Sequence, residues 1–249
     1  MRHARFSRLT VIGLALSVLS AVAASETDKI LQASKHCDRG FRLLEKWQVD
    51  KARASFEKAL KLVPSYPDGH VGLGHVALNA KQYEAALAEY ELAREGYTKL
   101  GDQLFNQKLK AYHESRSKVN DLRQLLNALE SGQEGDPTST QQVFRITAIQ
   151  VQIETLENMP PPTKETATEP PGELDFHVGN ALARLGRWEE AIEALEACIR
   201  KSPEFPAAHN NVALAYWRTG RVEDARKSLI QAEALGFDVN PRFKADLGL

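Results

Sequence analysis

The sequence predicts an all-α protein: a solenoid of stacked helical hairpins with a long antiparallel helical hairpin inserted into it. Three observations predict this fold. Small and apolar residues recur at a fixed step of 34 residues in two separate stretches of the chain. The segment between these stretches carries apolar residues at helical spacing. Proline and glycine stand where the helices of each stretch are expected to end.

The 34-residue step joins residues of similar size. A step of about 20–50 residues is typical of repeat architectures. We therefore place four repeats, at 33–66, 67–100, 172–205 and 206–239, which form one pair at 33–100 and a second pair at 172–239. The matched residues are Gly40 with Gly74, Ala52 with Ala86, Phe56 with Tyr90 and Ala59 with Ala93 in the first pair, and Gly179 with Ala213, Leu182 with Tyr216, Ala191 with Ala225 and Leu195 with Leu229 in the second.

This pattern resembles the tetratricopeptide repeat (TPR), a helix–turn–helix unit of about 34 residues. The small residues at positions 8 and 20 and the large apolar residue at position 24 follow the family's pattern. Position 4, usually tryptophan, departs from it and holds His36, His70, Asp175 and His209. The resemblance implies that the helix pairs cover one another's apolar faces and form a groove for a protein or peptide partner.

Glycine and proline mark the expected helix ends. Gly186 and Gly220 stand where the first helix of the third and fourth repeats should end, a place that favours the left-handed backbone conformation. Pro203 should stop the second helix of the third repeat, because proline lacks the backbone N–H and clashes inside a helix. Asn240 precedes a proline and is a good N-cap, so residues 240–249 are expected to form a C-terminal capping helix.

The segment 101–158 is expected to form the inserted hairpin. Asp102 is expected to cap a helix that runs to about Glu130, and a second helix follows at about 140–158. Both carry an apolar residue at every third or fourth position, so they should fold back on each other. The Pro-rich run 159–171 is expected to be an extended linker. The alternative is that the insert holds two degenerate repeats.

Residues 1–23 have the three parts of a secretory signal peptide. A start with three arginines precedes a mostly apolar stretch of 14 uncharged residues, and small residues follow, so cleavage is expected after Ala23 or Ala24. The alternative is a membrane anchor, but a spanning helix needs about 20 apolar residues. We therefore expect an exported protein, periplasmic or secreted, with no stable membrane insertion after cleavage.

The sequence carries no catalytic or cofactor motif, so it predicts no enzyme and no cofactor. The histidines fall at repeat positions and lack the short ligand spacing of a metal site, so no metal is expected. Cys198 stands where other repeats carry alanine, which predicts a small buried side chain. A disulfide with Cys37 is not expected, because the two lie in the first and third repeats. The net charge of −1 gives no electrostatic reason to bind nucleic acid.

The resemblance implies that the first helix of each repeat lines the concave groove. Asn180 and Asn211 match asparagines that grip a peptide backbone in some family members, and an amide side chain offers a donor and an acceptor. Phe176 replaces the basic residue of the carboxylate-clamp members, so a clamp for a C-terminal carboxylate is not expected. The expected partner-binding residues are His75 and Asn79 in the first pair, and Phe176, Asn180, Arg184, Asn210, Asn211, Trp217 and Arg218 in the second.

Two functions follow from these features. The first is a non-enzymatic scaffold that binds a peptide or helix of a partner protein, with Arg184 and Arg218 available for a carboxylate and Trp217 for an apolar side chain. The second is a structural protein that self-associates into a homo-oligomer through the apolar stripe of residues 102–158. The sequence does not identify the partner, and it leaves open whether the two repeat pairs form one continuous solenoid.

Overall fold

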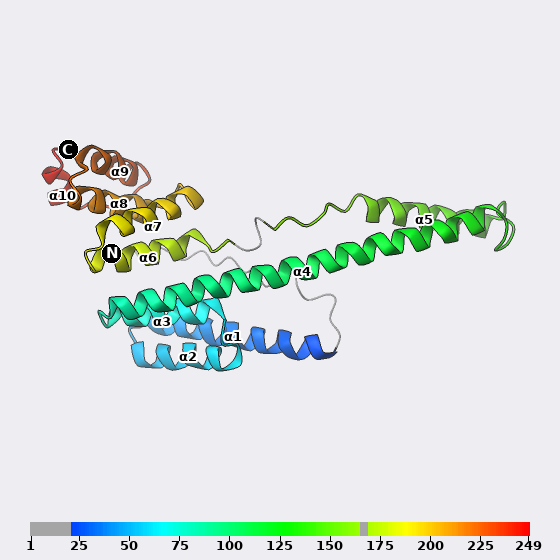
Figure 1. The fold of residues 1–249 in the computed structure, drawn as a ribbon, viewed down its shortest axis with the longest axis horizontal. Helices are drawn as coiled ribbons and strands as arrows, with labels where there is room; N and C mark the ends of the chain where they lie inside the picture. Colours follow the sequence, from blue (N-terminus) through cyan, green and yellow to red (C-terminus); the bar gives the residue numbers. More distant parts are fainter. Residues whose placement is uncertain (1–20, 165–168) are drawn as a thin grey trace. The chain divides into compact units, whose positions relative to one another are not determined.

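The computed structural model describes residues 21–164 and 169–249, with side chains from residue 28 on, so most of the expected signal peptide at 1–23 lies outside the described residues. In the described ranges every regular element is an α-helix, which confirms the all-α prediction (Figure 1). None of these helices is both long and apolar enough to cross a membrane. The helices are α1 (Ala21–Glu45), α2 (Val49–Leu62), α3 (Pro67–Asn79), α4 (Tyr83–Glu130), α5 (Thr140–Glu157), α6 (Gly172–Arg184), α7 (Trp188–Lys201), α8 (Pro206–Arg218), α9 (Val222–Ala234) and α10 (Pro241–Asp246).

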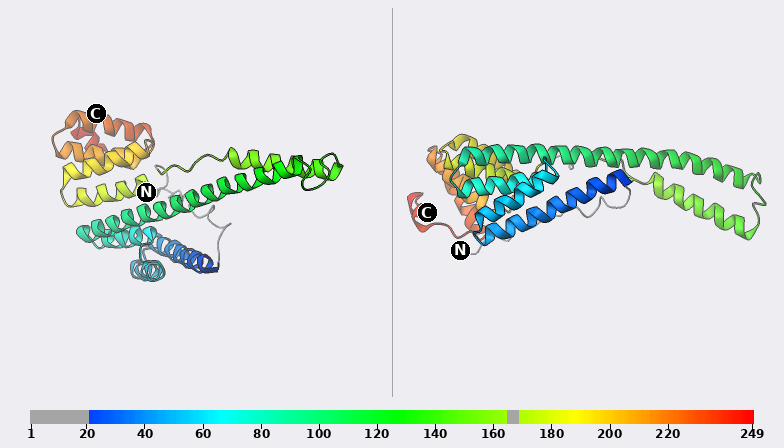
Figure 2. Two further views of the ribbon diagram at one scale, coloured as in Figure 1. Left: turned by 45° about the vertical axis from the view of Figure 1, so that its right-hand side comes forward. Right: turned by 90° about the horizontal axis from the view of Figure 1, so that it is seen from below.

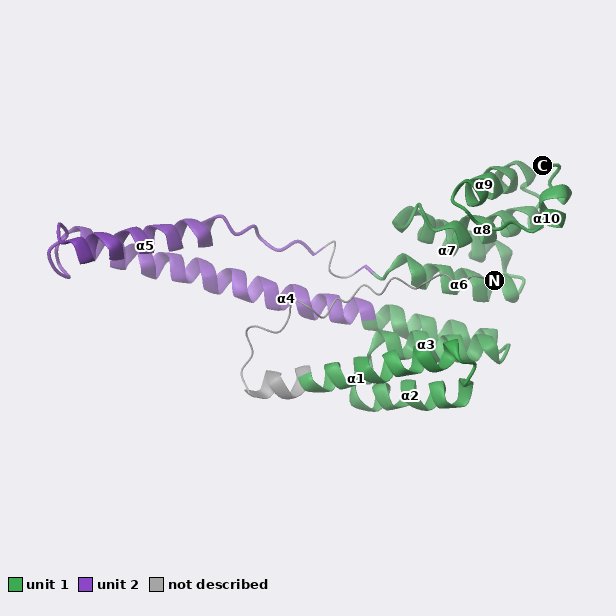
Figure 3. Ribbon diagram, turned by 180° about the vertical axis from the view of Figure 1, so that it is seen from behind, with its two compact units in different colours: residues 1–96, 170–249 green, residues 97–169 purple. Residues whose placement is uncertain are grey.

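The chain divides into two compact units (Figure 3). Unit 1 comprises Met1–Gly96 and Pro170–Leu249 and, as far as it is described, holds the helix pairs α1–α2, α3–α4, α6–α7 and α8–α9. Unit 2 comprises Tyr97–Glu169 and holds the later part of α4 together with α5. Both repeat pairs therefore belong to the same unit, although the residues of unit 2 separate them in the sequence.

Small residues allow the helices of each repeat to approach closely, and in the second pair α6–α9 form two hairpins side by side (Figure 2). Removing apolar surface from water stabilises a fold by about 25 cal/mol per Å², so fully buried positions identify the contacts that hold the repeats together. The four alanines at position 20 are completely buried, and the large residues at position 24 are at most 1% exposed: Ala52, Ala86, Ala191 and Ala225, then Phe56, Tyr90, Leu195 and Leu229.

The turn between the two helices of a repeat requires one residue with a left-handed backbone. Gly186 and Gly220 have φ angles of 77° and 78°, which confirms the prediction for these two positions. The first two repeats carry Trp47 and Lys81 at the equivalent position, with φ angles of 58° and 59°. A side chain makes this conformation costly by about 1 kcal/mol or more. Trp47 is 74% exposed, so packing does little to offset the cost.

We therefore expect the substitution Trp47→Gly to raise the free energy of unfolding by about 0.5–1 kcal/mol, because glycine adopts positive φ without strain. Urea unfolding followed by circular dichroism measures the change. Gly186→Trp provides the reciprocal control and should lower stability. A loss of stability in Trp47→Gly would mean that the exposed indole makes a contact worth more than the backbone strain.

One helix boundary predicted from the sequence is wrong. Asp102 does not cap a new helix, because α4 runs without a break from Tyr83 to Glu130 over 48 residues. Gly96 lies inside this helix, where a Cβ atom would come within 2.6 Å of the carbonyl oxygen of Ser65. This glycine permits close packing and does not end the helix. An interior glycine costs only about 1 kcal/mol, which the uninterrupted hydrogen bonds of α4 outweigh.

In unit 2, α5 packs against the later part of α4. The side chain of Ser139 accepts a hydrogen bond from the backbone N–H of Gln142 and caps the start of α5. Arg123 on α4 forms an ion pair with Glu157 on α5 at 2.5 Å. The apolar residues between the two helices form one small buried cluster: Val119, Leu129, Ile149 and Ile153, with Leu122, Leu125, Leu126, Ile146 and Leu156 partly buried around it.

The short helix α10 covers the end of the last repeat. The side chain of Asn240 accepts a hydrogen bond from the backbone N–H of Arg242 at 2.9 Å, so Asn240 caps this helix as predicted. The ring of Phe243 lies 5.6 Å from that of Trp217, and Leu247 is only 1% exposed. The apolar side of the fourth repeat is therefore shielded from solvent at its C-terminal end.

Candidate functional site

The structure joins the two asparagines that the sequence singles out. The amide nitrogen of Asn211 on α8 donates a hydrogen bond to the side-chain oxygen of Asn180 on α6 at 2.6 Å. The amide nitrogen of Asn210 donates to the oxygen of Asn211 at 2.9 Å. Within the described chain, the amide nitrogen of Asn180 and the side-chain oxygen of Asn210 have no hydrogen-bond partner. All three side chains are half-buried, so this row of amides is held in position while the amide nitrogen of Asn180 and the side-chain oxygen of Asn210 can still bond to a partner.

Arg218 is held at the end of α8 by two tryptophans. Its guanidinium lies 5.5 Å from the ring centroid of Trp188 and 5.2 Å from that of Trp217. Such cation–π contacts orient the group while its N–H donors remain available. Arg218 is exposed, as is Arg184 at the equivalent position of α6. Because Trp217 also contacts Phe243 of α10, its ring is less accessible than an apolar anchor for a partner requires.

The remaining predicted groove residues do not gather at this row of amides. Phe176 packs edge-on against Phe205 at the start of α8, with 4.8 Å between ring centroids. Asn79 is exposed at the end of α3. His75 is enclosed by aromatic rings: the centroid of His177 lies 4.3 Å away, and those of Phe41 and Tyr90 lie 6.1 Å away.

The surroundings of His75 make it a packing residue. Burial lowers its pKa to about 4. Burial, together with repulsion from His75, also lowers the pKa of His177. Both imidazoles are therefore neutral near pH 7. The Nε2 atom of His75 and the hydroxyl of Tyr90 are buried without a hydrogen-bond partner in the described part of the chain.

A buried carboxylate lies on α6 two residues before His177. Asp175 on α6 has only 3% of its side chain exposed and pairs with Arg94 of α4 at 3.1 Å and with Lys201 of α7 at 2.7 Å. Lys201 also donates to the carbonyl oxygen of Pro170 at 3.0 Å. These bonds fix the point where the chain re-enters unit 1. The one sequence signal was an acidic residue at repeat position 4, where the family carries an aromatic packing residue.

Two histidines at repeat position 4 have the same structural role. His70 Nε2 lies 2.9 Å from the carbonyl oxygen of Pro64, and His209 Nε2 lies 2.9 Å from that of Pro203. Each ring thus ties the start of one repeat to the end of the preceding one. Among the described residues no group of three or more His, Cys, Asp or Glu side chains could hold a metal ion.

Both cysteines are free and buried. Burial raises the pKa of Cys37 above its usual range and that of Cys198 to about 12. Since the thiolate is the nucleophilic form, neither side chain is activated for chemistry. As predicted, Cys198 is a small buried residue, with 0% of its surface exposed.

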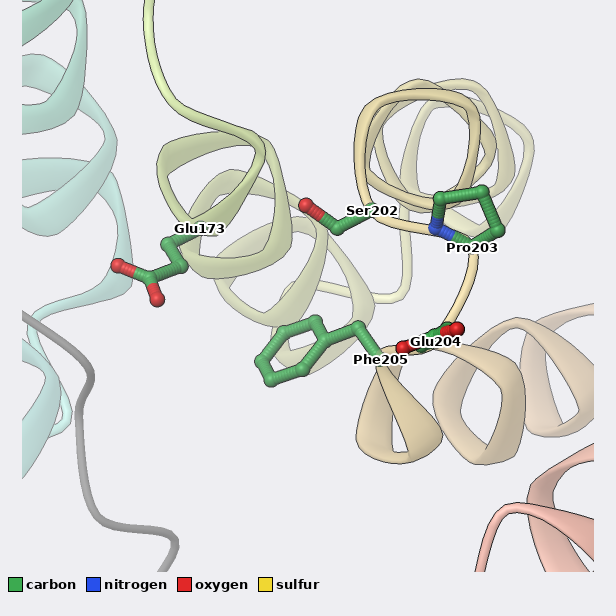
Figure 4. Close-up of a pocket in the computed structure, with 5 residues that line it drawn as sticks. All are labelled: Glu173, Ser202, Pro203, Glu204 and Phe205. Carbon is green, nitrogen blue, oxygen red and sulfur yellow. The ribbon is translucent and has the colours of Figure 1, made fainter. Parts of the chain in front are cut away.

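A hollow of about 440 Å³ lies beside the start of α6 (Figure 4). Glu173 projects from α6, and the other lining residues come from the connection between α7 and α8: Ser202, Pro203, Glu204 and Phe205. Burial raises the pKa of the Glu173 carboxyl. The lining therefore combines two carboxyl groups with the hydroxyl of Ser202.

Comparison with known proteins identifies the repeat. A sequence profile described as tetratricopeptide repeat matches residues 38–99 and 179–238. No curated protein sequence is detectably similar to the chain.

Several solved structures resemble the chain. YrrB, described as a TPR protein with an unusual peptide-binding site, is 21% identical, covering 92% of this chain and 97% of that chain, with a TM-score of 0.29. A thermophilic TPR protein from Thermus thermophilus is 17% identical, and the alignment covers 87% of this chain and 97% of that protein, with a TM-score of 0.38. PilF of Pseudomonas aeruginosa is 17% identical, and the alignment covers 87% of this chain and 81% of PilF, with a TM-score of 0.37. At these identities the likeness concerns the fold alone.

Proposed function

Because the chain belongs to the tetratricopeptide-repeat family, whose fold indicates a protein–protein interaction scaffold, we propose that it holds an extended segment of a partner protein against α6 and α8. TPR proteins are generally non-enzymatic, which supports a binding role. The observation that carries the proposal is the hydrogen bond between Asn180 and Asn211, which spans two consecutive repeats.

The chemistry of this row suits a peptide backbone. A peptide unit presents one N–H donor and one C=O acceptor. The amide nitrogen of Asn180 can donate to the carbonyl, and the oxygen of Asn210 can accept from the N–H. Because the amides already bond to each other, little side-chain entropy is lost when the segment binds. Arg184 and Arg218 add positive charge on the same two helices, which favours a segment that carries a carboxylate side chain.

We also propose that the protein acts after export, in the periplasm or outside the cell. The support for this is the N-terminal sequence, where a basic start, an apolar stretch and small residues follow one another. Mass spectrometry of protein recovered from the cell envelope or medium tests it: the proposal requires an N-terminus after Ala23 or Ala24, and a chain that starts at Met1 contradicts it.

Replacing Asn180, Asn211 and Arg218 by alanine together should abolish capture of the partner without unfolding the protein. The measurement is crosslinking in the native compartment, followed by mass spectrometry of the captured proteins. A matched triple variant, Glu193→Ala, Arg200→Ala and Gln231→Ala, changes exposed residues of α7 and α9 and should capture the same partner as the unchanged protein. Undiminished capture by the first variant would place the binding surface elsewhere.

A further inference from the structure

Helix α5 carries apolar residues on both of its sides. Ile149 and Ile153 on one side are buried against α4. On the opposite side Phe144 is 73% exposed and Val151 is 57% exposed. Among the described residues these are two of the most exposed large apolar side chains, and one helix presents both of them on the same face. Desolvating such a face is favourable, so it is a candidate contact surface.

Two threonines make this face more apolar than its composition suggests. The hydroxyl of Thr147 donates to the carbonyl oxygen of Val143 at 2.9 Å. The hydroxyl of Thr155 donates to the carbonyl oxygen of Val151 at 2.8 Å. Both hydroxyls are thus satisfied within α5 itself, and burying the methyl groups beside them leaves no polar group unpaired.

The exposed face has the spacing of a helix-pairing seam. Phe144, Ala148, Val151 and Thr155 follow one another by four, three and four positions, the d, a, d and a positions of two heptads. None of the four is charged. A segment that covers them must itself be uncharged and apolar, because an ionised side chain placed against this face would be desolvated without a partner.

The seam is complementary to itself when two copies run antiparallel. Antiparallel pairing about the middle of α5 sets a positions against d positions of the other copy. Phe144 then opposes Thr155, and Ala148 opposes Val151, so each large side chain meets a small one and no like charges meet. We propose that the outer face of α5 is the seam of an antiparallel homodimer, in which Phe144 and Val151 pack between the α5 helices of two copies.

This inference goes beyond the proposed binding of a partner segment and does not depend on it. It also changes the self-association expected from the sequence, since the apolar stripe of α4 is already used against α5 within one chain. A seam of two heptads is short, so the dimer belongs to the weak class of interfaces, with a dissociation constant roughly in the micromolar range.

Sedimentation of the full chain from about 1 to about 300 µM tests the proposal. The unchanged protein should shift from monomer to dimer over this range. Phe144→Glu should raise the dissociation constant by at least about 100-fold, because two buried rings are lost and two charges are placed in the seam. Ile230→Glu changes an equally apolar residue, 51% exposed on α9, and should dimerise like the unchanged protein. Circular dichroism checks that both variants keep their helix content.

Cysteine crosslinking tests the direction of the pairing. An equimolar mixture of Ala148→Cys and Val151→Cys should form a disulfide-linked heterodimer, whereas Thr155→Cys should not link to itself. The native cysteines do not interfere, because both are buried. A monomer at all concentrations, equal dimerisation of Phe144→Glu and the unchanged protein, or efficient self-linkage of Thr155→Cys would each overturn the proposal.

Discussion

Replacing Phe56 by alanine is expected to lower the free energy of unfolding by about 3–5 kcal/mol. Its ring is fully buried and fills the space between two glycines of neighbouring helices. A Cβ atom built at Gly40 would lie 2.4 Å from the ring, and one built at Gly72 would lie 2.2 Å from it. Both glycines therefore exist to admit this ring, and its removal leaves a cavity between α1 and α3 that the rigid helices cannot fill by shifting.

The same geometry predicts that Gly72→Ala lowers the stability of the unchanged protein but raises the stability of the Phe56→Ala variant. In the unchanged protein the added methyl group overlaps the ring of Phe56 and should cost about 1–3 kcal/mol. In the Phe56→Ala background the overlap is gone, and alanine is favoured over glycine inside a helix by up to about 1 kcal/mol. Gly72→Ala should therefore stabilise that variant.

Urea unfolding of the two single variants and the double variant, followed by circular dichroism, gives the interaction energy as a double-mutant cycle. Ala85→Gly on an exposed stretch of α4 is a control for helix propensity alone. Additive effects of Phe56→Ala and Gly72→Ala would show that the ring and the glycine do not share one space.

The repeats were predictable from the sequence because their signals are local and recur. The starts of α6 and α8, at Gly172 and Pro206, coincide with the predicted repeat boundaries. The break at Asp102 was predicted wrongly, because a short polar residue after glycine usually favours a helix start. The helix α4 continues through this point, and its close approach at Gly96 to the backbone at Ser65 is a contact between distant residues that the local sequence does not reveal.

The candidate site was predictable to a smaller extent. Asn180 and Asn211 could be paired from the repeat register, since equivalent turns of consecutive helices face each other. The enclosure of His75 could not be predicted, because its partner His177 is about a hundred residues away across the insert. Nor could the pairing of Asp175 with Arg94, although a carboxylate at a packing position already indicated that a cation had to be near.

The histidine cluster predicts that the fold weakens in mild acid. In the unfolded chain a histidine has a pKa of about 6.5, whereas burial lowers that of His75 to about 4 and also lowers that of His177. Below pH 6.5 the unfolded state therefore binds more protons than the folded state, and stability falls as the pH falls. Between pH 6.5 and 5, His75 alone should account for a loss of about 1.5 kcal/mol.

His75→Phe should remove this part of the pH dependence, because phenylalanine keeps the contacts with Phe41 and Tyr90 but carries no titrating group. The free energy of unfolding is measured at pH 7 and pH 5, and the difference between the two values is compared with that of the unchanged protein. The comparison does not depend on whether phenylalanine fits better or worse, since a packing effect changes both values equally. An identical pH dependence in the two proteins would mean that the imidazole can take up a proton without leaving its aromatic surroundings, and that the contact with His177 is not closed to solvent.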